Sequence, residues 1–239
     1  ETMNEDDAIR EWLEDCAERL HRALRQSNFN TAIHEIYLDL VAFGTAALFM
    51  AEKPTIATGG FPGFSFLPIP VGTFVIAEDH EGRVDTLGRK FARSARAAVT
   101  RWGDAVGPKI TETAKTKPDQ MVDILHFVTP RTDRVYDSAG QPKRGGTNMA
   151  WQSCYVSMAD KTKIEEGGFE EFPFMVPRWT KTSGETYGRG PSHTAIPDIR
   201  TLNALVQFTL KALPMGIQPP TIERNDSVIN AQPDLSPGG

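Results

Sequence analysis

Several kinds of pattern are scarce or missing in this chain of 239 residues. It contains only two cysteines, Cys16 and Cys154, which lie far apart and form no CxxC pair. Two distant cysteines do not make a disulfide framework, so we expect two packed thiols in a reduced, intracellular protein. No apolar run approaches about 18 residues, so the sequence predicts no membrane-spanning helix.

Sequence signatures of catalysis are also missing. There is no phosphate-binding loop of the form GxxxxGK[ST], no GxGxxG after a strand and no GxSxG nucleophile motif. The five histidines form no HExxH or HxH pattern, and none clusters with cysteine. The acidic pairs Glu165-Glu166 and Glu170-Glu171 flank Gly167-Gly168 and are interpreted as a solvated hairpin. We therefore expect no catalytic residue, no cofactor and no metal site.

Charge of one sign is not in large excess. The formal net charge is −5, which argues against a protein that grips nucleic acid through many phosphate contacts. The charges are nevertheless segregated along the chain. Residues 1–20 hold eight acidic and two basic side chains, whereas residues 83–109 hold seven basic and two acidic ones. Such blocks are either ordinary solvated faces or surfaces that steer neighbouring copies together.

The N-terminal part is predicted to be helical. Residues 4–26 carry apolar side chains at helical spacing, with Asn4 as the N-cap and arginines towards the C-terminal end. Asn30 is predicted to cap a second helix, which Gly44 ends. A buried strand over 45–50 follows, although a continuing helix stays open as an alternative because short apolar runs are ambiguous.

The middle of the chain is predicted to be rich in strands. Residues 53–70 contain several Gly and Pro and are interpreted as a loop whose aromatic side chains plug an edge of the core. A hairpin is expected from 73–78 and 83–91, because a four-residue connection ending in Gly82 suits a type I turn with a left-handed glycine. The other expected elements are a short helix capped by Ser94 and ended by Gly103, a second short helix within 104–118, strands at 121–129, 148–158 and 169–179, and a polar loop at 130–147.

A glycine-proline turn, with the sequence YGRGP, precedes the last predicted helix. Gly188 and Gly190 are expected to adopt backbone angles closed to other residues, and Pro191 to fix the exit direction. Pro197 suits the first turn of a helix whose apolar residues recur at helical spacing until Pro214. The whole order of elements predicts an α+β fold with a mixed or antiparallel sheet, packed helices and a projecting C-terminal helix.

Three stretches carry a resemblance to a known family. They are SNFNTAIHEIYLDLVAFGTAALFMAE at 27–52, IPVGTFVIAEDHEGRVDTLGRKF at 69–91, and EFPFMVPRW followed by GETYGRGP before the last helix. Taken in order, they resemble the head-to-tail connector, or portal, proteins of short-tailed bacteriophages over most of positions 9–220. Portal proteins are considerably longer and this chain starts at Glu1, so we expect a fragment of a longer protein.

The resemblance implies a structural role without covalent chemistry. Residues 1–190 would be the α/β wing, 191–214 a helix of the stem, and 215–239 an extended or disordered tail. About twelve copies would form a ring at a capsid vertex, through which double-stranded DNA passes. Terminase, tail adaptor and capsid proteins would dock on it, in the virion and, during assembly, in the host cytoplasm.

The resemblance also suggests roles for particular residues. The corner between wing and stem is assigned to Arg178, Trp179, Tyr187, Gly188, Arg189, Gly190 and Pro191. A contact between subunits is assigned to Arg89, Lys90, Arg93 and Arg96. Two other functions stay open: a monomeric DNA-binding adaptor, which needs a continuous basic face, and a hydrolase, which needs a deep pocket with converging titratable groups.

Overall fold

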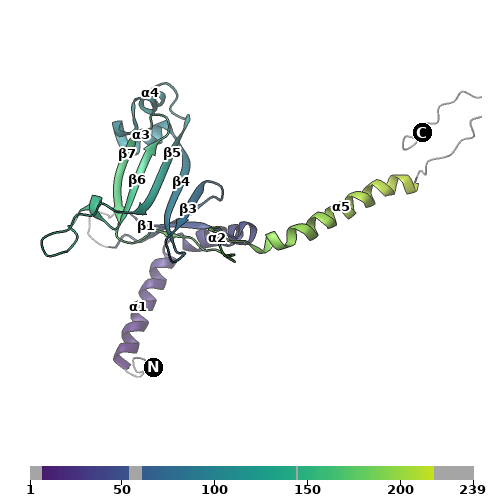
Figure 1. The fold of residues 1–239 in the computed structure, drawn as a ribbon, viewed down its shortest axis with the longest axis horizontal. Coiled ribbons are helices and arrows are strands. Elements are labelled where there is room, and N and C mark those ends of the chain that lie inside the picture. Colours follow the sequence, from purple (N-terminus) through teal and green to yellow (C-terminus); the bar gives the residue numbers. More distant parts are fainter. Residues whose placement is uncertain (1–6, 54–60, 144, 218–239) are drawn as a thin grey trace, which may run out of the picture. The chain divides into compact units, whose positions relative to one another are not determined.

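The chain is described by a computed structural model over residues 7–53, 61–143 and 145–217. It forms two compact units, which divide between Gly190 and Pro191. Within the described residues, the first unit contains two antiparallel sheets and four α-helices, and the second contains one long helix (Figure 1). The expected α+β fold is confirmed.

The elements follow one another in this order. The helices are α1 (Asp7–Arg25), α2 (Phe29–Phe43), α3 (Ala95–Trp102), α4 (Pro108–Thr116) and α5 (Pro191–Ile217), with 3₁₀ turns η2 (Gly103–Val106) and η3 (Gly146–Asn148). The strands are β1 (Ala47–Glu52), β2 (Phe64–Ile69), β3 (Phe74–Glu78), β4 (Val84–Ser94), β5 (Met121–Pro130), β6 (Trp151–Ser157), β7 (Lys163–Phe169) and β8 (Phe174–Met175).

The larger sheet is a five-stranded meander in the order β3-β4-β5-β6-β7. Its first turn is the predicted hairpin, and Gly82 has the expected left-handed φ of 78°. At the centre of the sheet, His126 of β5 pairs with Arg89 of β4 on one side and with Tyr155 of β6 on the other. Directly opposed residues project to the same face of a sheet, so these three side chains lie together.

One end of that face is covered by α3, η2 and α4. Ile124 and Tyr155 pack there against buried Ala98, Val106 and Ile110. The predicted cap of α3 is confirmed, since the hydroxyl of Ser94 accepts a hydrogen bond from the backbone N–H of Ala97 at 3.3 Å. The second short helix expected within 104–118 is α4.

The smaller sheet has the order β2-β1-β8, with β1 antiparallel to both neighbours. The strand expected over 45–50 is thus confirmed as β1. The loop expected over 53–70 is wrong for its second half, because residues 64–69 form β2. Within β2, Phe66 is only 2% exposed and does fill the core, as the aromatic pattern suggested, whereas Phe61 is exposed.

Helix α2 packs on this smaller sheet, with Ala32 and Ile36 buried against Leu48. The predicted cap at Asn30 is wrong, because the helix begins at Phe29 after Asn28. The Asn28 side chain binds β2 instead of the helix: its amide donates to the carbonyl of Phe66 at 2.6 Å and accepts from the same residue's N–H at 2.9 Å. This clamp fixes the start of α2 against the sheet.

Two further expectations about strands are corrected. The acidic pairs do not flank a hairpin, because Gly167 and Gly168 lie within β7 and pair with Ser153 and Gln152. The strand expected over 169–179 is reduced to the two residues of β8. It does lie at the edge of its sheet, as its prolines required.

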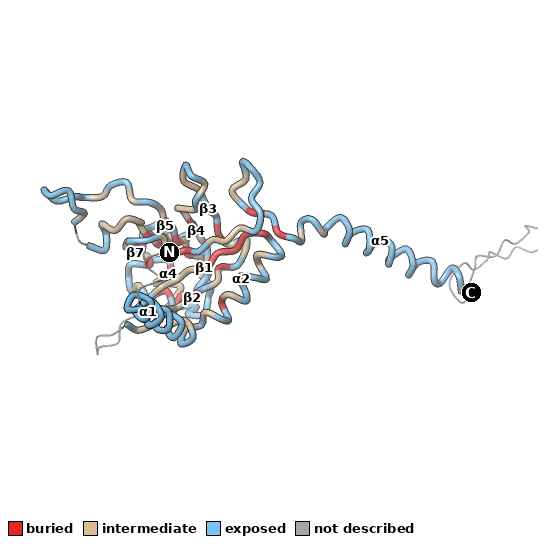
Figure 2. The backbone as a smooth tube through the Cα atoms, turned by 90° about the horizontal axis from the view of Figure 1, so that it is seen from below, coloured by how far each residue is buried: buried red, intermediate tan, exposed pale blue. Residues whose placement is uncertain are grey.

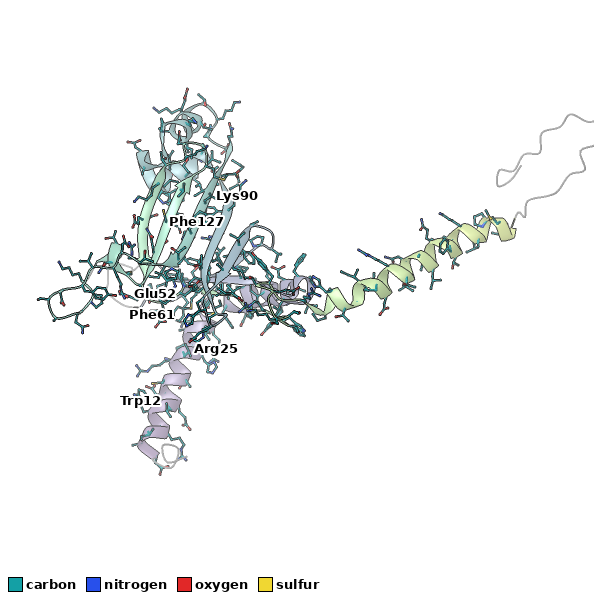
Figure 3. All side chains as sticks on the ribbon, viewed as in Figure 1. Trp12, Arg25, Glu52, Phe61, Lys90 and Phe127 are labelled. Atoms are coloured by element: carbon teal, nitrogen blue, oxygen red, sulfur yellow. The ribbon has the colours of Figure 1, made fainter. Side chains whose placement is uncertain are left out.

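Helix α1 is confirmed over residues 7–25, and the predicted cap Asn4 lies outside the described residues. None of its residues is buried, and Trp12, labelled in Figure 3, is 64% exposed. Figure 2 colours nearly all of α1, and nearly all of α5, as exposed. Among the described residues, no helix is both long and apolar enough to cross a lipid bilayer.

Helix α5 is longer than predicted. It begins at Pro191 rather than Pro197 and continues to Ile217, so Pro214 does not end it. Each proline inside a helix removes one backbone N–H donor. Helix α5 nevertheless continues through both Pro197 and Pro214. Residues 215–217 of the expected tail are helical, and residues 218–239 lie outside the described residues.

Candidate functional site

The glycine-proline turn singled out in the sequence packs against the end of α2. Helix α2 ends at Gly44, which has a left-handed φ of 78° and donates its N–H to the carbonyl of Leu40 at 2.9 Å. The next residue, Thr45, accepts a hydrogen bond on its side-chain hydroxyl from the N–H of Gly188, at 2.7 Å. Segments more than 140 residues apart are joined at this point.

Gly188 and Gly190 are required for close packing and not for unusual backbone angles. Neither has a positive φ, so the expectation of backbone angles closed to other residues is wrong. A Cβ atom on Gly188 would lie 2.5 Å from the carbonyl oxygen of Gly44, and one on Gly190 would lie 2.6 Å from that of Val41. The obstacles are backbone atoms, which cannot move aside as a side chain can. Any other residue at these positions would push the turn off α2.

Arg178 fixes the other side of the turn. Its guanidinium donates to the carbonyl of Thr186 at 3.1 Å and to that of Gly82, in the β3-β4 turn, at 2.9 Å. It also forms an ion pair with Glu78, which Lys181 joins at 2.6 Å. One side chain thereby connects the segment before α5 to the five-stranded sheet.

The other residues assigned to the corner serve mainly through their backbones. Trp179 donates its N–H to the carbonyl of Gly44 at 2.9 Å, while its indole is exposed. Arg189 donates its N–H to Thr180 at 2.8 Å and pairs through its side chain with Glu185. Tyr187 differs, because its hydroxyl accepts the N–H of Ile76, on the outer edge of the five-stranded sheet, at 3.2 Å. Pro191 is the first residue of α5.

The basic residues assigned to a subunit contact occupy different environments. Lys90, labelled in Figure 3, and Arg96 are exposed and pair with Asp123 at 2.7 Å and Asp119 at 3.4 Å. Arg93 is exposed and lies over the ring of Phe91. Arg89, in contrast, is turned into the subunit, where its Nε donates to Nδ1 of His126 at 3.1 Å.

A buried polar pair that the sequence did not predict lies beside Arg89. His126 is fully buried, its Nε2 lies 3.0 Å from the hydroxyl oxygen of Ser153, and its ring stacks on Tyr155. Because Arg89 donates to Nδ1, the ring proton sits on Nε2 and is donated to Ser153. Burial, with the charges of Arg89 and Arg101, lowers the pKa of His126 to about 3. A histidine that already donates to a serine is not its general base, so this pair is structural.

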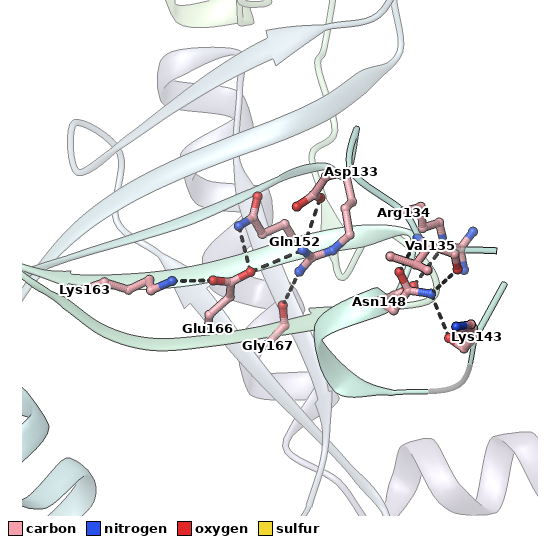
Figure 4. A network of polar contacts seen from close by, with 10 residues as sticks. Asp133, Arg134, Val135, Lys143, Asn148, Gln152, Lys163, Glu166 and Gly167 are labelled. Atoms are coloured by element: carbon pink, nitrogen blue, oxygen red, sulfur yellow. Dashed lines mark hydrogen bonds and ion pairs between the residues drawn. The ribbon is translucent and has the colours of Figure 1, made fainter. Parts of the chain in front are cut away.

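Acidic side chains on β7 and just after it hold a long loop in place. Glu166 of β7 binds Lys163 at 2.6 Å and Arg131 at 3.2 Å (Figure 4). Glu170, which follows β7, binds Arg134 at 3.0 Å. Hydrogen bonds from Lys163 and then Arg131 hold the pKa of Glu166 below its usual range. These carboxylates are engaged in ion pairs, and within the described part of the chain no group of three acidic, histidine or cysteine side chains could hold a metal ion.

The profile of the family described as bacteriophage head to tail connecting protein matches residues 1–239. The chain is 30% identical over 245 residues to the probable portal protein of Bordetella phage BPP-1, an alignment that covers 99% of this chain and 41% of that protein. It is 27% identical over 237 residues to the portal protein of Salmonella phage epsilon15, with 96% and 40% covered.

The chain therefore spans about two fifths of the length of these relatives. The match extends over all of the present sequence, including the glycine-proline turn and the residues that hold it. On this evidence the chain belongs to the family of bacteriophage head to tail connecting proteins.

Proposed function

We propose that this chain is a structural part of a portal ring, which forms the DNA channel at one vertex of a phage capsid. The whole-length family match and the two portal relatives carry this proposal. About twelve copies would surround double-stranded DNA during packaging and ejection, and terminase, tail adaptor and capsid proteins would dock on the ring. The subunit would act in the host cytoplasm during assembly and then in the virion.

The exposed apolar side chains support an assembled state. Helix α5 has no buried residue, although it carries many large apolar side chains. Monomers rarely leave such surfaces open to water, because burying them in a partner is favourable. The exposed apolar residues of α5 are Ile196, Ile199, Leu202, Leu205, Val206, Phe208, Leu210, Leu213, Met215 and Ile217.

We further propose a division of labour within the chain. Residues 1–190 would form the wing, and α5 would contribute to the stem that lines the channel. The turn from Tyr187 to Pro191, seated on Gly44 and fixed by Arg178, would set where the stem helix leaves the wing. Tight backbone contacts within the first unit hold the turn against the end of α2 and support this role.

The segregated charges would orient neighbouring subunits. Acidic side chains on α1 are exposed, as are Lys90, Arg93 and Arg96 on and beside β4. Complementary surfaces of this kind favour a head-to-tail contact, and a head-to-tail contact that closes by rotation gives a ring.

The test is the assembly of the full-length protein that contains this sequence. Mass photometry and negative-stain electron microscopy should show closed rings with a central hole. The double substitution Gly188→Val with Gly190→Val should abolish or distort the rings, whereas Gly167→Val, at a position with open space for a side chain, should leave them intact. A wild-type protein that stays monomeric would overturn the ring, and normal rings from the double variant would overturn the role of the turn.

A further inference from the structure

A small pocket lies between the two sheets of the first unit, away from the glycine-proline turn. It has a volume of about 200 Å³. One wall is apolar and comes from the end of β2 and the following residues, Leu67 to Pro70. The opposite wall comes from β4 and α3. No aspartate or glutamate lines it, and its charged lining residues are Arg89, Lys90, Arg93 and Arg101.

The three arginines of this lining converge on the pocket because two come from one face of β4 and the third comes from α3. Arg89 and Arg93 lie on the same face of β4 with Phe91 between them, since alternate residues of a strand share a face. Their guanidinium carbons are 5.2 and 5.7 Å from the centre of the Phe91 ring. Arg101 reaches the pocket from α3 and lies over the rings of Trp102 and Tyr155 at 4.5 and 5.2 Å.

These three arginines have no acidic partner, which distinguishes them from their neighbours. Lys90 and Arg96 each pair with an aspartate, whereas no carboxylate within the described residues pairs with Arg89, Arg93 or Arg101. Aromatic rings hold the guanidinium groups in place but neutralise nothing. Three like charges therefore converge on one small space that no carboxylate of the described residues neutralises.

The convergence of charges destabilises the charged form of Arg89. Burial lowers the pKa of Arg89 most, and the charges of Arg93 and Arg101 lower it further. Tyr155 has the opposite effect and raises this pKa. Charged side chains in protein interiors are normally paired, because an uncompensated charge loses its hydration. An anion in the pocket would remove both the repulsion and part of the desolvation penalty.

We propose that this pocket binds a small oxyanion of the phosphate class. Guanidinium groups present several N–H donors in a planar fork that matches phosphate oxygens. Arg89 uses its Nε to bind His126 and also hydrogen-bonds with Tyr155. A doubly charged anion matches three converging cations better than a single carboxylate does. The volume suits a phosphate group and is below the range typical of larger ligands. The group is either dissolved phosphate or the phosphate of a larger molecule.

The test measures the binding of inorganic phosphate by isothermal titration calorimetry, with chloride at equal ionic strength as the reference. The wild-type protein should bind phosphate, and Arg93→Gln with Arg101→Gln should weaken binding at least about tenfold, since charge-assisted hydrogen bonds are lost. Arg96→Gln is the matched control, because Arg96 is on the same helix as Arg101, is exposed and does not line the pocket. It should change the affinity less than about twofold.

A second measurement separates loss of the site from loss of the fold. In phosphate-free buffer the double variant should be at least as stable to urea as the wild type, because two repelling charges are gone. Phosphate should then stabilise the wild type and Arg96→Gln but not the double variant. A short oligonucleotide that displaces phosphate would identify the phosphate of a nucleic acid as the source, and failure to displace it would exclude a nucleic acid.

The proposal is overturned if the wild type binds phosphate no better than chloride, or if the double variant binds it as the wild type does. Arg93 and Arg96 are also assigned to the contact between subunits, so phosphate binding and urea stability are compared between proteins of the same oligomeric state.

Discussion

The guanidinium of Arg178 lies against the carboxylate of Glu78, a residue 100 positions earlier in the chain. Glu78 is the last residue of β3, and the same guanidinium also reaches the carbonyl of Gly82 in the following turn. The β3-β4 hairpin and the segment before α5 are thereby fixed to one another through a single side chain, whose mostly buried position strengthens each contact.

Replacing Arg178 by Met should lower the free energy of unfolding by roughly 2–3 kcal/mol, because its bonds to two carbonyl groups are lost. Urea unfolding followed by circular dichroism measures this change. Arg83→Met, in the same hairpin but with an exposed side chain, should change stability by less than about 0.5 kcal/mol. Equal effects of the two substitutions would contradict the bridging role of Arg178.

Substitution of Gly190 by Ala should destabilise the first unit by roughly 3 kcal/mol, since the added methyl group would overlap backbone oxygen atoms of α2. Gly167→Ala is the control, because nothing lies within 4 Å of its added carbon and its φ is ordinary. Urea midpoints of the two variants give the comparison. If Gly190→Ala is as stable as Gly167→Ala, the close contact between the turn and α2 does not exist in solution.

Stability should depend on pH through His126. The unfolded chain protonates this histidine near pH 6.5, whereas the folded protein does so only at about pH 3. The unfolded state therefore binds more protons between these values, so this residue makes stability fall as pH is lowered from about 6.5, with a slope of up to about 1.4 kcal/mol per pH unit. The contribution is fully present above pH 6.5.

Urea unfolding at a series of pH values measures the slope, and the His126→Gln variant should have a shallower one between pH 4 and pH 6.5. Carboxylates contribute equally to both proteins, so the difference between them isolates His126. In the wild type, the NMR signals of the His126 ring should not titrate above pH 4. Titration near pH 6.5 would show that the ring is not held neutral by burial.

The long loop between β5 and β6 should depend on Asn148. Its side chain accepts the N–H of Val135 at 2.7 Å and donates to the carbonyls of Val135 and Lys143, each at 2.8 Å (Figure 4). Asn148→Ala should speed hydrogen exchange and proteolysis within residues 134–143 while global stability changes little. Gln141→Ala, in the same loop, should leave both rates unchanged. Equal protection in the two variants would contradict the role of Asn148.

The sequence predicted best those elements that local chemistry determines. The turn before Gly82, the end of α2 at Gly44 and the cap of α3 at Ser94 each follow from one residue's own backbone preference or a short-range hydrogen bond. The errors arose where tertiary position overrides composition. Pro68 is tolerated because β2 is an edge strand, and Gly167 lies in β7, which is also an edge strand.

The sequence singled out the glycines of the turn, but the backbone angles expected for them were wrong. The turn was recognised from Gly188 and Gly190, yet the contact that requires them, with the end of α2, spans most of the chain and leaves no local signal. His126 lies within the strand expected over 121–129. Its pairing with Arg89 depends on the register between β4 and β5, which periodicity alone does not give.

The pairing of β1 with β8 determines the order in which parts of the first unit can fold during synthesis on the ribosome. The five-stranded meander joins only strands that follow one another, so it can form as soon as β7 has emerged. The second edge of β1, in contrast, can pair only after β8 has been synthesised, when Phe174 pairs with Phe49. The hydrogen bond between Gly188 and Thr45 can form only later still. The turn that precedes α5 is thus the last part of the first unit to form its contacts. Until β8 pairs with β1, the nascent chain exposes an unpaired edge of β1, which can pair wrongly with other strands.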